Sequence, residues 1–396
     1  MSTSPLSDRI NNLSTSQTLA MAAKARELKA QGVDIISLSL GEPDFNTPDF
    51  IKEAAIQAIH DNYSTYTPVD GYVELKEAIS RKFKRDNHLD YKPSQIVVST
   101  GAKQSLYNIA QVLINPGDEV IIPAPFWVSY VEIIKIAGGI PVEVPTTIEN
   151  DFKITAAQLE KAITAKTKMI WFSSPCNPSG SVYSKEEFES LVEVLERHPS
   201  VYVVADEIYE HINFTEKHVS IASIGTMINR TITVNGVSKA FAMTGWRIGY
   251  IGAPEEIAKA CTKMQGQVTS GANSIAQRAT IAAVEADPSV LKDMVAAFRS
   301  RRDLVVKLVR EIPGMKINVP EGAFYVFPNI EAFFGRTIQG ITINNADDFS
   351  MLLLEKAHVA TVTGDAFGNP NCIRFSYATS EDQLTEALRR IKKVLE

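Results

Sequence analysis

Val201-Tyr202-Val203-Val204-Ala205-Asp206 is a short apolar run, rich in β-branched residues, that ends in a carboxylate. Such a run predicts a buried strand. Similar apolar runs lie at 96–100, 119–123 and 169–172, and helical patterns separate them. Strands that alternate with helices predict βαβ units and a largely parallel sheet, so the expected fold class is α/β. Open sheets of this kind hold ligands at the carboxyl ends of their strands, where Asp206 would stand.

The length of the chain allows more than one domain. It has 396 residues, 45% of them hydrophobic, which suffices for one large α/β domain and a smaller one. We expect residues 49–287 to form the large domain, and residues 1–48 and 288–396 together to form a small α+β domain. Apolar residues between 288 and 313 have roughly the spacing of one long amphipathic helix.

Composition excludes several classes of protein. The net charge of −6 gives no electrostatic footprint for nucleic acid or for an anionic membrane. No apolar run approaches the ~20 residues of a membrane span, and residues 1–12 lack the apolar stretch of a secretory signal. The cysteines are few, odd in number and without a CxxC pair, which argues against a disulfide framework and a zinc site. We therefore expect a cytoplasmic enzyme without a metal site.

Lys239 follows a predicted strand, at the end of Val234-Asn235-Gly236-Val237-Ser238, and lies eight residues before Arg247 in a turn flanked by glycines. A lone lysine at a strand end is usually an exposed surface residue. A partly desolvated lysine near other cations has a lowered pKa, however, and it then becomes the amine nucleophile that an aldehyde cofactor needs. The neighbouring motifs favour the second interpretation.

Two further strand ends carry polar side chains that fit such a cofactor. A buried carboxylate at Asp206 needs a partner, and the protonated ring nitrogen of a cofactor would be one; the alternative is that Asp206 caps the next helix. Tyr209 could hydrogen-bond a phenolic oxygen on the same ring. Asn177 lies in a turn-rich loop after the run at 169–172, and its amide could donate to that oxygen as well.

Other candidates surround this set. Gly101-Ala102-Lys103 joins a predicted strand to a helix, where free backbone N–H groups and the helix dipole can bind a phosphate. Trp127 is either a core residue or an aromatic platform for the ring. Arg374 lies inside an apolar run, so it needs an anionic partner, which is either a substrate carboxylate or a residue of the protein.

Taken together, these motifs resemble the class I aminotransferases of pyridoxal-phosphate (PLP) fold type I, and within them the aspartate aminotransferase-like branch common in bacteria. The likeness extends from Gly41-Glu42-Pro43-Asp44-Phe45 to Arg374, which is nearly the whole chain. Each motif is weak alone, but the set occurs in one order with gaps similar to those of the family.

The resemblance implies a role for each candidate. Lys239 would carry PLP as a Schiff base and move the substrate proton, Asp206 would pair with the ring nitrogen, and Trp127 would stack on the ring. The remaining cofactor ligands would be Tyr209 and Asn177 at the phenolic oxygen. At the phosphate they would be Arg247, the backbone of Gly101, Ala102 and Lys103, and the Tyr66 of a second subunit. The substrate would be held by Arg374 at its α-carboxylate, with Gly41, Trp127 and Asn177 nearby.

Two features depart from familiar members of the family. Many members have a hydroxyl residue three positions before the lysine, where this chain has Gly236. No arginine occurs between residues 266 and 277 that could reach a distal carboxylate from a neighbouring subunit. By resemblance to the bacterial branch, Lys103 takes that role.

The expected reaction is PLP-dependent transamination between an amino acid and a 2-oxo acid, with aspartate and 2-oxoglutarate as the pair and prephenate as a further acceptor. The segment 14–18 is expected to lie over the site and to influence the use of prephenate. A lyase or synthase on the same scaffold is an alternative, and a ligand-sensing regulator is another. The resemblance also implies a homodimer with its sites at the interface.

Overall fold

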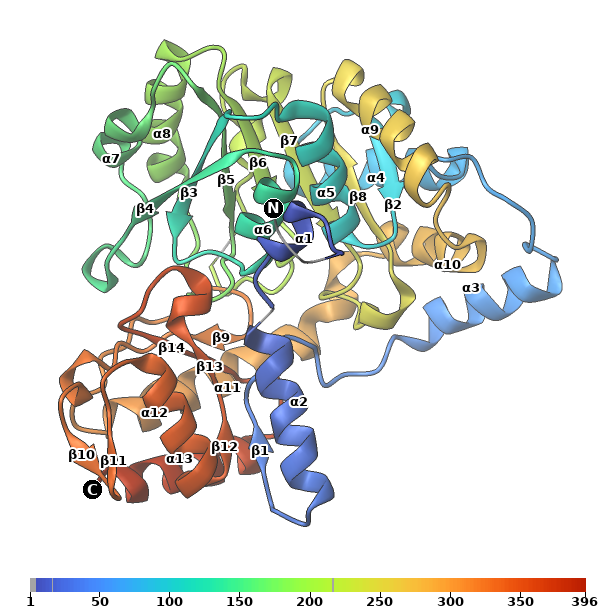
Figure 1. Cartoon of the computed structure of the whole chain (residues 1–396). Helices are drawn as coiled ribbons and strands as arrows, with labels where there is room; N and C mark the ends of the chain where they lie inside the picture. Colours follow the sequence, from blue (N-terminus) through green and yellow to red (C-terminus); the bar gives the residue numbers. More distant parts are fainter. Residues whose placement is uncertain (1–4, 16, 216) are drawn as a thin grey trace.

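The computed structural model describes residues 5–15, 17–215 and 217–396. Its centre is one seven-stranded sheet with the strand order β2-β8-β7-β6-β5-β3-β4 (Figure 1). The strands are β2 (Ile96–Ser99), β3 (Glu119–Ala124), β4 (Ile140–Pro145), β5 (Thr167–Ser173), β6 (Tyr202–Asp206), β7 (Thr231–Gly236) and β8 (Gly249–Gly252). Only β8 runs antiparallel to its neighbours among these strands, so the predicted mostly parallel sheet is confirmed.

Helices pack around this sheet and bury its strands, except the edge strand β4, which stays partly exposed. They are α3 (Asp49–His60), α4 (Val73–Lys82), α5 (Ala102–Leu113), α6 (Ser129–Ile136), α7 (Ala156–Ala162), α8 (Lys185–Arg197), α9 (Glu255–Val268) and α10 (Ser274–Glu285). Local sequence sets some of their boundaries. Ser184 and Glu187, for example, form a capping box that opens α8.

A second group of elements lies below the sheet in Figure 1. Its helices are α2 (Gln17–Ala30), α11 (Lys292–Arg310), α12 (Ala346–Leu352) and α13 (Glu381–Leu395). Its strands are β1 (Ile36–Ser37), β9 (Tyr325–Val326), β10 (Thr337–Ile338), β11 (Ile341–Thr342), β12 (Val359–Ala360), β13 (Val362–Thr363) and β14 (Ile373–Ser376). The long helix expected over 288–313 is α11, preceded by a 3₁₀ turn that Pro288 opens.

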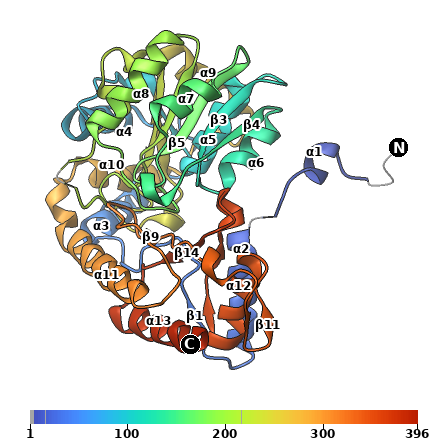
Figure 2. The same ribbon diagram turned by 90° about the vertical axis from the view of Figure 1, so that its left-hand side faces the viewer.

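The N-terminal segment joins distant parts of the chain. Strand β1 pairs in parallel with β12, so residues near the start of the chain lie in a sheet with residues near 360. The short helix α1 (Asp8–Asn11) is set apart from both groups of elements (Figure 2). After it, the Ser14 N–H donates to Glu132 on α6 at 3.0 Å.

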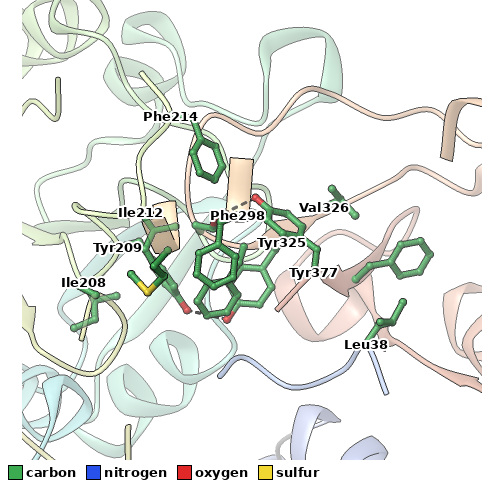
Figure 3. Close-up of a cluster of buried hydrophobic side chains, with 14 of the residues drawn as sticks. Leu38, Ile208, Tyr209, Ile212, Phe214, Phe298, Tyr325, Val326 and Tyr377 are labelled. Carbon is green, nitrogen blue, oxygen red and sulfur yellow. Dashed lines mark hydrogen bonds between the residues drawn. The ribbon is translucent and has the colours of Figure 1, made fainter. Parts of the chain in front are cut away.

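A buried aromatic cluster connects the two groups of elements (Figure 3). Phe298 of α11 stacks on Phe324 with ring centroids 5.2 Å apart, and Tyr209 packs edge-on against Phe324 at 5.4 Å. Burial of such rings stabilises this junction. No helix among the described residues is both long and apolar enough to cross a membrane.

Candidate active site

The pocket lies at the edge of the seven-stranded sheet that is formed by the carboxyl ends of its parallel strands. The carboxyl ends of parallel strands meet there, and because β8 is antiparallel, the residues that precede its start reach the same edge. A pocket of about 420 Å³ opens at this edge, next to β14 of the second group. Ten predicted site residues line it: Gly41, Ala102, Lys103, Trp127, Asn177, Asp206, Tyr209, Lys239, Arg247 and Arg374.

Lys239 follows the end of β7 and reaches into the pocket. Its Nζ donates to the carbonyl oxygen of Gly41 at 2.6 Å. Burial lowers the pKa of Lys239 to about 8; the carboxylate of Glu42 opposes the shift and the charge of Arg374 adds to it. A substantial fraction of the amine is therefore neutral near pH 8, and a neutral amine is nucleophilic.

Asp206 ends β6 and is buried. Its Oδ2 accepts from the Tyr130 hydroxyl at 2.7 Å, and its Oδ1 accepts from the Ile208 N–H at 3.2 Å. Burial raises the pKa of this carboxyl to about 6, although both hydrogen bonds lower it. No salt bridge to Asp206 occurs among the described residues, so a bound cation would stabilise its charged form.

The hydroxyl of Tyr209 lies 2.8 Å from that of Tyr325. Tyr325 also explains why residue 41 is glycine, because a Cβ there would lie 2.3 Å from the Tyr325 hydroxyl oxygen. The backbone at Gly41 thus approaches Tyr325 closely, while the Gly41 carbonyl faces Lys239.

Arg374 on β14 is only 2% exposed. Its Nη1 donates to Asn177 Oδ1 at 2.9 Å and its Nη2 to the Ser39 carbonyl oxygen at 2.6 Å. Its Nε has no hydrogen-bond partner, and no ion pair to Arg374 occurs in the part of the chain that the structure describes. The internal salt bridge that the sequence allowed is therefore not formed there, and the guanidinium can receive an anion from the pocket. Because Asn177 Oδ1 is engaged, its amide N–H groups remain as donors.

The amino end of α5 provides the second anionic subsite. Gly101 has φ +84° and ψ 156°, a conformation open essentially to glycine alone, and a Cβ there would lie 2.4 Å from Arg247 Nη2. The first N–H groups of a helix have no partner within it. The guanidinium of Arg247 and the start of α5 are thus held together at the pocket, as an anion-binding site requires.

Lys103 and Trp127 form one wall of the pocket. The Nζ of Lys103 lies 4.8 Å from the centroid of the Trp127 ring. Burial lowers the pKa of Lys103, and the charge of Arg247 lowers it further. This ammonium makes no ion pair with any described residue, so it is available to an anionic ligand.

Gly236 has a steric explanation. A Cβ at this position of β7 would lie 2.9 Å from the Ile248 carbonyl oxygen and 3.0 Å from Gly249 Cα. A hydroxyl residue therefore does not fit here without a shift of the adjoining strand. The close packing of β7 on β8 therefore accounts for glycine in place of the hydroxyl residue that many family members have here.

Two predicted site residues do not line this pocket, Gly101 and Tyr66. Gly101 precedes Ala102, which does line it, whereas Tyr66 is 98% exposed. Of the segment 14–18, Thr18 lines the pocket, whereas Ser16 lies outside the described residues.

The sequence did not reveal Tyr130, Tyr325 or Ser39 as site residues. Tyr130 lies three positions after Trp127, at the start of α6, which is a helical spacing that could have suggested it. Ser39 contributes a backbone carbonyl, and Tyr325 comes from a distant strand, so no local signal marks either residue.

Comparison with known proteins agrees with this geometry. The family "Aminotransferase class I and II" matches residues 33–391. The chain belongs to this family. An aminotransferase of Rhizobium leguminosarum, called a probable aspartate/prephenate aminotransferase, is 49% identical over 98% of each chain. A bifunctional aspartate aminotransferase and glutamate/aspartate-prephenate aminotransferase of Petunia hybrida is 48% identical over 98% of this chain and 82% of that protein.

Solved aminotransferases share the fold over the whole length. The aspartate aminotransferase of Rhizobium meliloti superposes with a TM-score of 0.96 at 45% identity, covering 99% of both chains. That of Thermus thermophilus, solved with maleate, has a TM-score of 0.92 at 42% identity and covers 99% of this chain and 100% of that one. The fold is thus PLP fold type I, and the chain is an aminotransferase that depends on pyridoxal 5'-phosphate.

The described pocket fits this cofactor. It offers an amine with a lowered pKa for the aldehyde, a buried carboxyl without a cation for the ring nitrogen, and a helix start beside Arg247 for the phosphate. These three requirements of one molecule are met within one cavity.

Proposed function

We propose that this aminotransferase moves an amino group between aspartate and 2-oxoglutarate. The observation that supports this proposal is that the pocket with Lys239 is also lined by Arg374, which is buried, and by Lys103, which is more exposed; neither has a carboxylate partner among the described residues. Two unpaired cations in one cavity favour substrates with two carboxylates. The names of the relatives support this choice, and so does the maleate, itself a dicarboxylate, in the Thermus thermophilus structure.

We assign the cofactor contacts as follows. Lys239 would bond the aldehyde carbon, Asp206 would pair with the ring nitrogen and Trp127 would stack on the ring. The other assigned contacts would be Tyr209 and Asn177 at the phenolic oxygen, and Arg247 with the backbone of Gly101, Ala102 and Lys103 at the phosphate. When bound, PLP supplies an electron sink for the bond that breaks at the substrate Cα.

The residues of the chain supply the remaining chemistry. The Lys239 amine would accept the proton from the substrate Cα and later give it back, a role for which a pKa of about 8 is well matched. The buried carboxyl of Asp206 is stabilised in its charged form when it faces a protonated nitrogen, and it thereby keeps that proton in place.

Substrate orientation follows from the two cations. The fork of Arg374 suits the α-carboxylate, and Asn177 holds that fork at 2.9 Å. The ammonium of Lys103 lies on the wall formed with Trp127 and suits the distal carboxylate. Gly41 borders the same space through its carbonyl. An amino acid held at both ends presents its Cα to Lys239.

Prephenate is proposed as a further amino acceptor. The names of the Petunia hybrida and Rhizobium leguminosarum relatives support this, since both include prephenate. Thr18 belongs to the N-terminal segment and lines the pocket, so we propose that it contacts this larger acid.

A homodimer is proposed as the working unit. Tyr66 is exposed, and so are several apolar side chains on α3, which forms the outer edge of the molecule in Figure 1. Exposed apolar surface of this kind marks an association site. All three cysteines are free and buried, which agrees with a reducing compartment such as the cytoplasm.

The test is replacement of Lys239 by alanine, with Lys259→Ala on the exposed face of α9 as the control. We expect Lys239→Ala to lose the absorbance of covalently held PLP and about 10³-fold or more of its turnover of aspartate with 2-oxoglutarate, because the group that bonds and moves the proton is gone. Full activity in Lys239→Ala would overturn the assignment. Loss of aspartate without an equal yield of glutamate in the wild type would favour the lyase or synthase instead.

A further inference from the structure

One turn of chain after β6 has two faces with different environments. Asp206 and Tyr209 line the pocket, whereas Glu207 and Glu210 are buried outside it. The turn is closed by the Glu210 N–H, which donates to the Glu207 carbonyl oxygen at 2.9 Å. Both pairs are three residues apart, so a single turn fixes the pocket face and the opposite face relative to each other.

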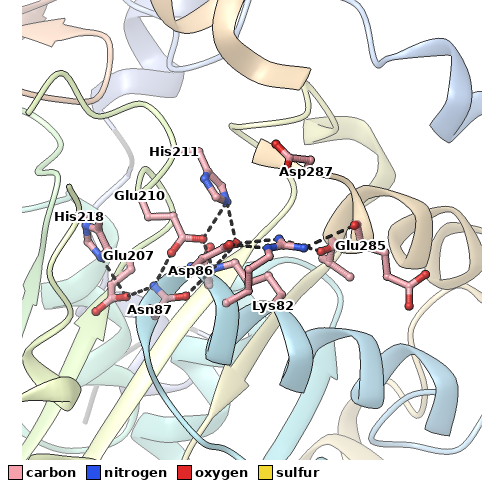
Figure 4. A network of polar contacts seen from close by, with 12 residues as sticks. Lys82, Asp86, Asn87, Glu207, Glu210, His211, His218, Glu285 and Asp287 are labelled. Carbon is pink, nitrogen blue, oxygen red and sulfur yellow. Dashed lines mark hydrogen bonds and ion pairs between the residues drawn. The ribbon is translucent and has the colours of Figure 1, made fainter. Parts of the chain in front are cut away.

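The two glutamates enter a buried polar network that starts from another element (Figure 4). Asn87, in the π-helical segment Phe83–Asn87 that extends α4, donates through Nδ2 to Glu210 Oε2 at 2.6 Å and to Glu207 Oε2 at 3.2 Å. Lys82 donates to Asn87 Oδ1 at 2.7 Å and pairs with Glu210 Oε1. One amide therefore bridges both carboxylates, and one ammonium holds that amide.

The buried charges of Lys82 and Glu210 require each other as partners. The side chains of Lys82 and Glu210 are 2% and 3% exposed, and an isolated charge at such depth would be strongly unfavourable. Burial alone would raise the pKa of Glu210, yet the positive charges of Lys82, His211 and His218 together outweigh it and the pKa lies well below its usual range. His211 lies 3.2 Å from Glu210 and His218 lies 3.1 Å from Glu207, and Asp86 lies 3.9 Å from Lys82 and 3.7 Å from His211.

The same carboxylates could in principle hold a metal ion. Ligand atoms of Glu207, Glu210 and His218 all lie within 4.8 Å of one another. Lys82 already provides the positive charge next to Glu210, and Asn87 donates to both glutamates, so these two carboxylates already have partners within the protein.

We propose that Lys82 is a positioning residue for the reaction. With Asn87 it clamps the Glu207–Glu210 turn from behind, and the turn in turn sets the Asp206 carboxylate and the Tyr209 hydroxyl toward the cofactor. Lys82 itself is absent from the pocket lining, so its effect passes only through this turn. The inference rests on the proposed contacts of Asp206 and Tyr209 with PLP.

The test compares Lys82→Met with the double variant Lys82→Met/Glu210→Gln, which removes both charges of the pair. Tyr209→Phe serves as the reference for a lost contact to the phenolic oxygen. Lys153→Met is the matched control, because Lys153 is also a largely buried lysine with a carboxylate partner, Glu187 at 2.7 Å, but lies outside the pocket. Each protein is measured for PLP affinity, for the pH dependence of the bound cofactor's absorbance, for kcat and KM, and for thermal stability without cofactor.

We expect Lys82→Met to bind PLP about tenfold more weakly and to lose about 10- to 100-fold in kcat with a smaller change in KM, because misplaced reacting groups have effects of this size. Its absorbance profile should shift in the same direction as that of Tyr209→Phe, and the double variant should recover most of both losses. Asn87→Ala, which keeps the ion pair, should show the same pattern more weakly and replaces Lys82→Met if that variant does not fold.

Two failures are distinguishable. If Tyr209→Phe leaves the absorbance profile unchanged, the proposed contact of Tyr209 with the cofactor is wrong. If Tyr209→Phe shifts the profile while Lys82→Met and Asn87→Ala, folded, keep the profile and kcat of the wild type or of Lys153→Met, the positioning role is wrong and the network serves stability alone.

Discussion

At the scale of single residues, burial shifts the pKa values of the two principal ionisable groups of the site in opposite directions. The pKa of Asp206 rises to about 6 and that of Lys239 falls to about 8. Both shifts disfavour the charged form, so both residues destabilise the cofactor-free protein near neutral pH. A ligand that pairs with one and bonds the other removes this cost, which couples cofactor binding to stability.

The pH dependence of stability tests this for Asp206. Between about pH 4 and pH 6 the native carboxyl holds a proton that the unfolded one has released, so its contribution is fully present below pH 4 and is lost as the pH rises through 6. Relative to Asp206→Asn, the cofactor-free wild type should lose about 2–3 kcal/mol of unfolding free energy across this range. Urea unfolding at fixed protomer concentration measures it. A constant difference between the two proteins would contradict the raised pKa.

Lys103 provides the residue-scale test of substrate choice. Lys103→Met should lower kcat/KM for aspartate about 10- to 100-fold, because a charge-assisted contact to the distal carboxylate is lost. Alanine, which has no second carboxylate, should be affected far less. Lys168→Met is the control, since Lys168 also lies over an aromatic ring, that of Tyr202 at 5.7 Å, but away from the pocket. Equal losses for both amino acids would assign Lys103 to the cofactor alone.

At the scale of elements, the start of α5 illustrates how a strand and a helix build one subsite. Gly249 on β8 allows the close approach, because a Cβ there would lie 2.1 Å from the Ala102 nitrogen. Gly101 then turns the chain into α5 against Arg247. The geometry of the subsite is thus a property of the packing of α5 on β8.

Gly101→Ala tests this element. The added Cβ would lie 2.4 Å from Arg247 and should lower cofactor affinity about tenfold or more. Because φ is +84°, the substitution should also cost about 1–3 kcal/mol of backbone strain. Gly117→Ala is the matched control, with φ +91° and no atom within 4 Å of the added Cβ. Titration of both cofactor-free proteins with PLP measures the affinity. Equal affinities in the two variants would show that only backbone strain matters.

At the scale of the whole molecule, Tyr66 decides whether a site is complete in one chain. It is exposed in the single chain, and we propose that it reaches the phosphate of a second copy. Mixing Tyr66→Ala with Lys239→Ala chains and allowing exchange should then restore activity, because each mixed dimer contains one site with both residues intact. Activity no higher than that of the Tyr66→Ala chains alone would mean that Tyr66 does not act across an interface. Size-exclusion chromatography of both parents provides the oligomeric state.

The sequence alone determined the alternation of strands and helices and the chemistry at the strand ends. Apolar runs such as 201–206 and the polar residues that follow them are local patterns, so β6 with Asp206 and β7 with Lys239 could be predicted from residue spacing. The mostly parallel sheet followed from the same alternation.

Only the tertiary structure decided what those residues contact. Tyr130 reaches Asp206 across 76 residues, Arg374 is held by the Ser39 carbonyl across 335 residues, and Lys82 supports the Glu207–Glu210 turn across 128. Such pairs have no periodicity in the sequence, because their distances depend on how strands of different sheets and helices pack. The affinity of the pocket for anions and the contacts that position the Glu207–Glu210 turn therefore depend on the tertiary packing. The reacting groups themselves can be recognised from local sequence patterns.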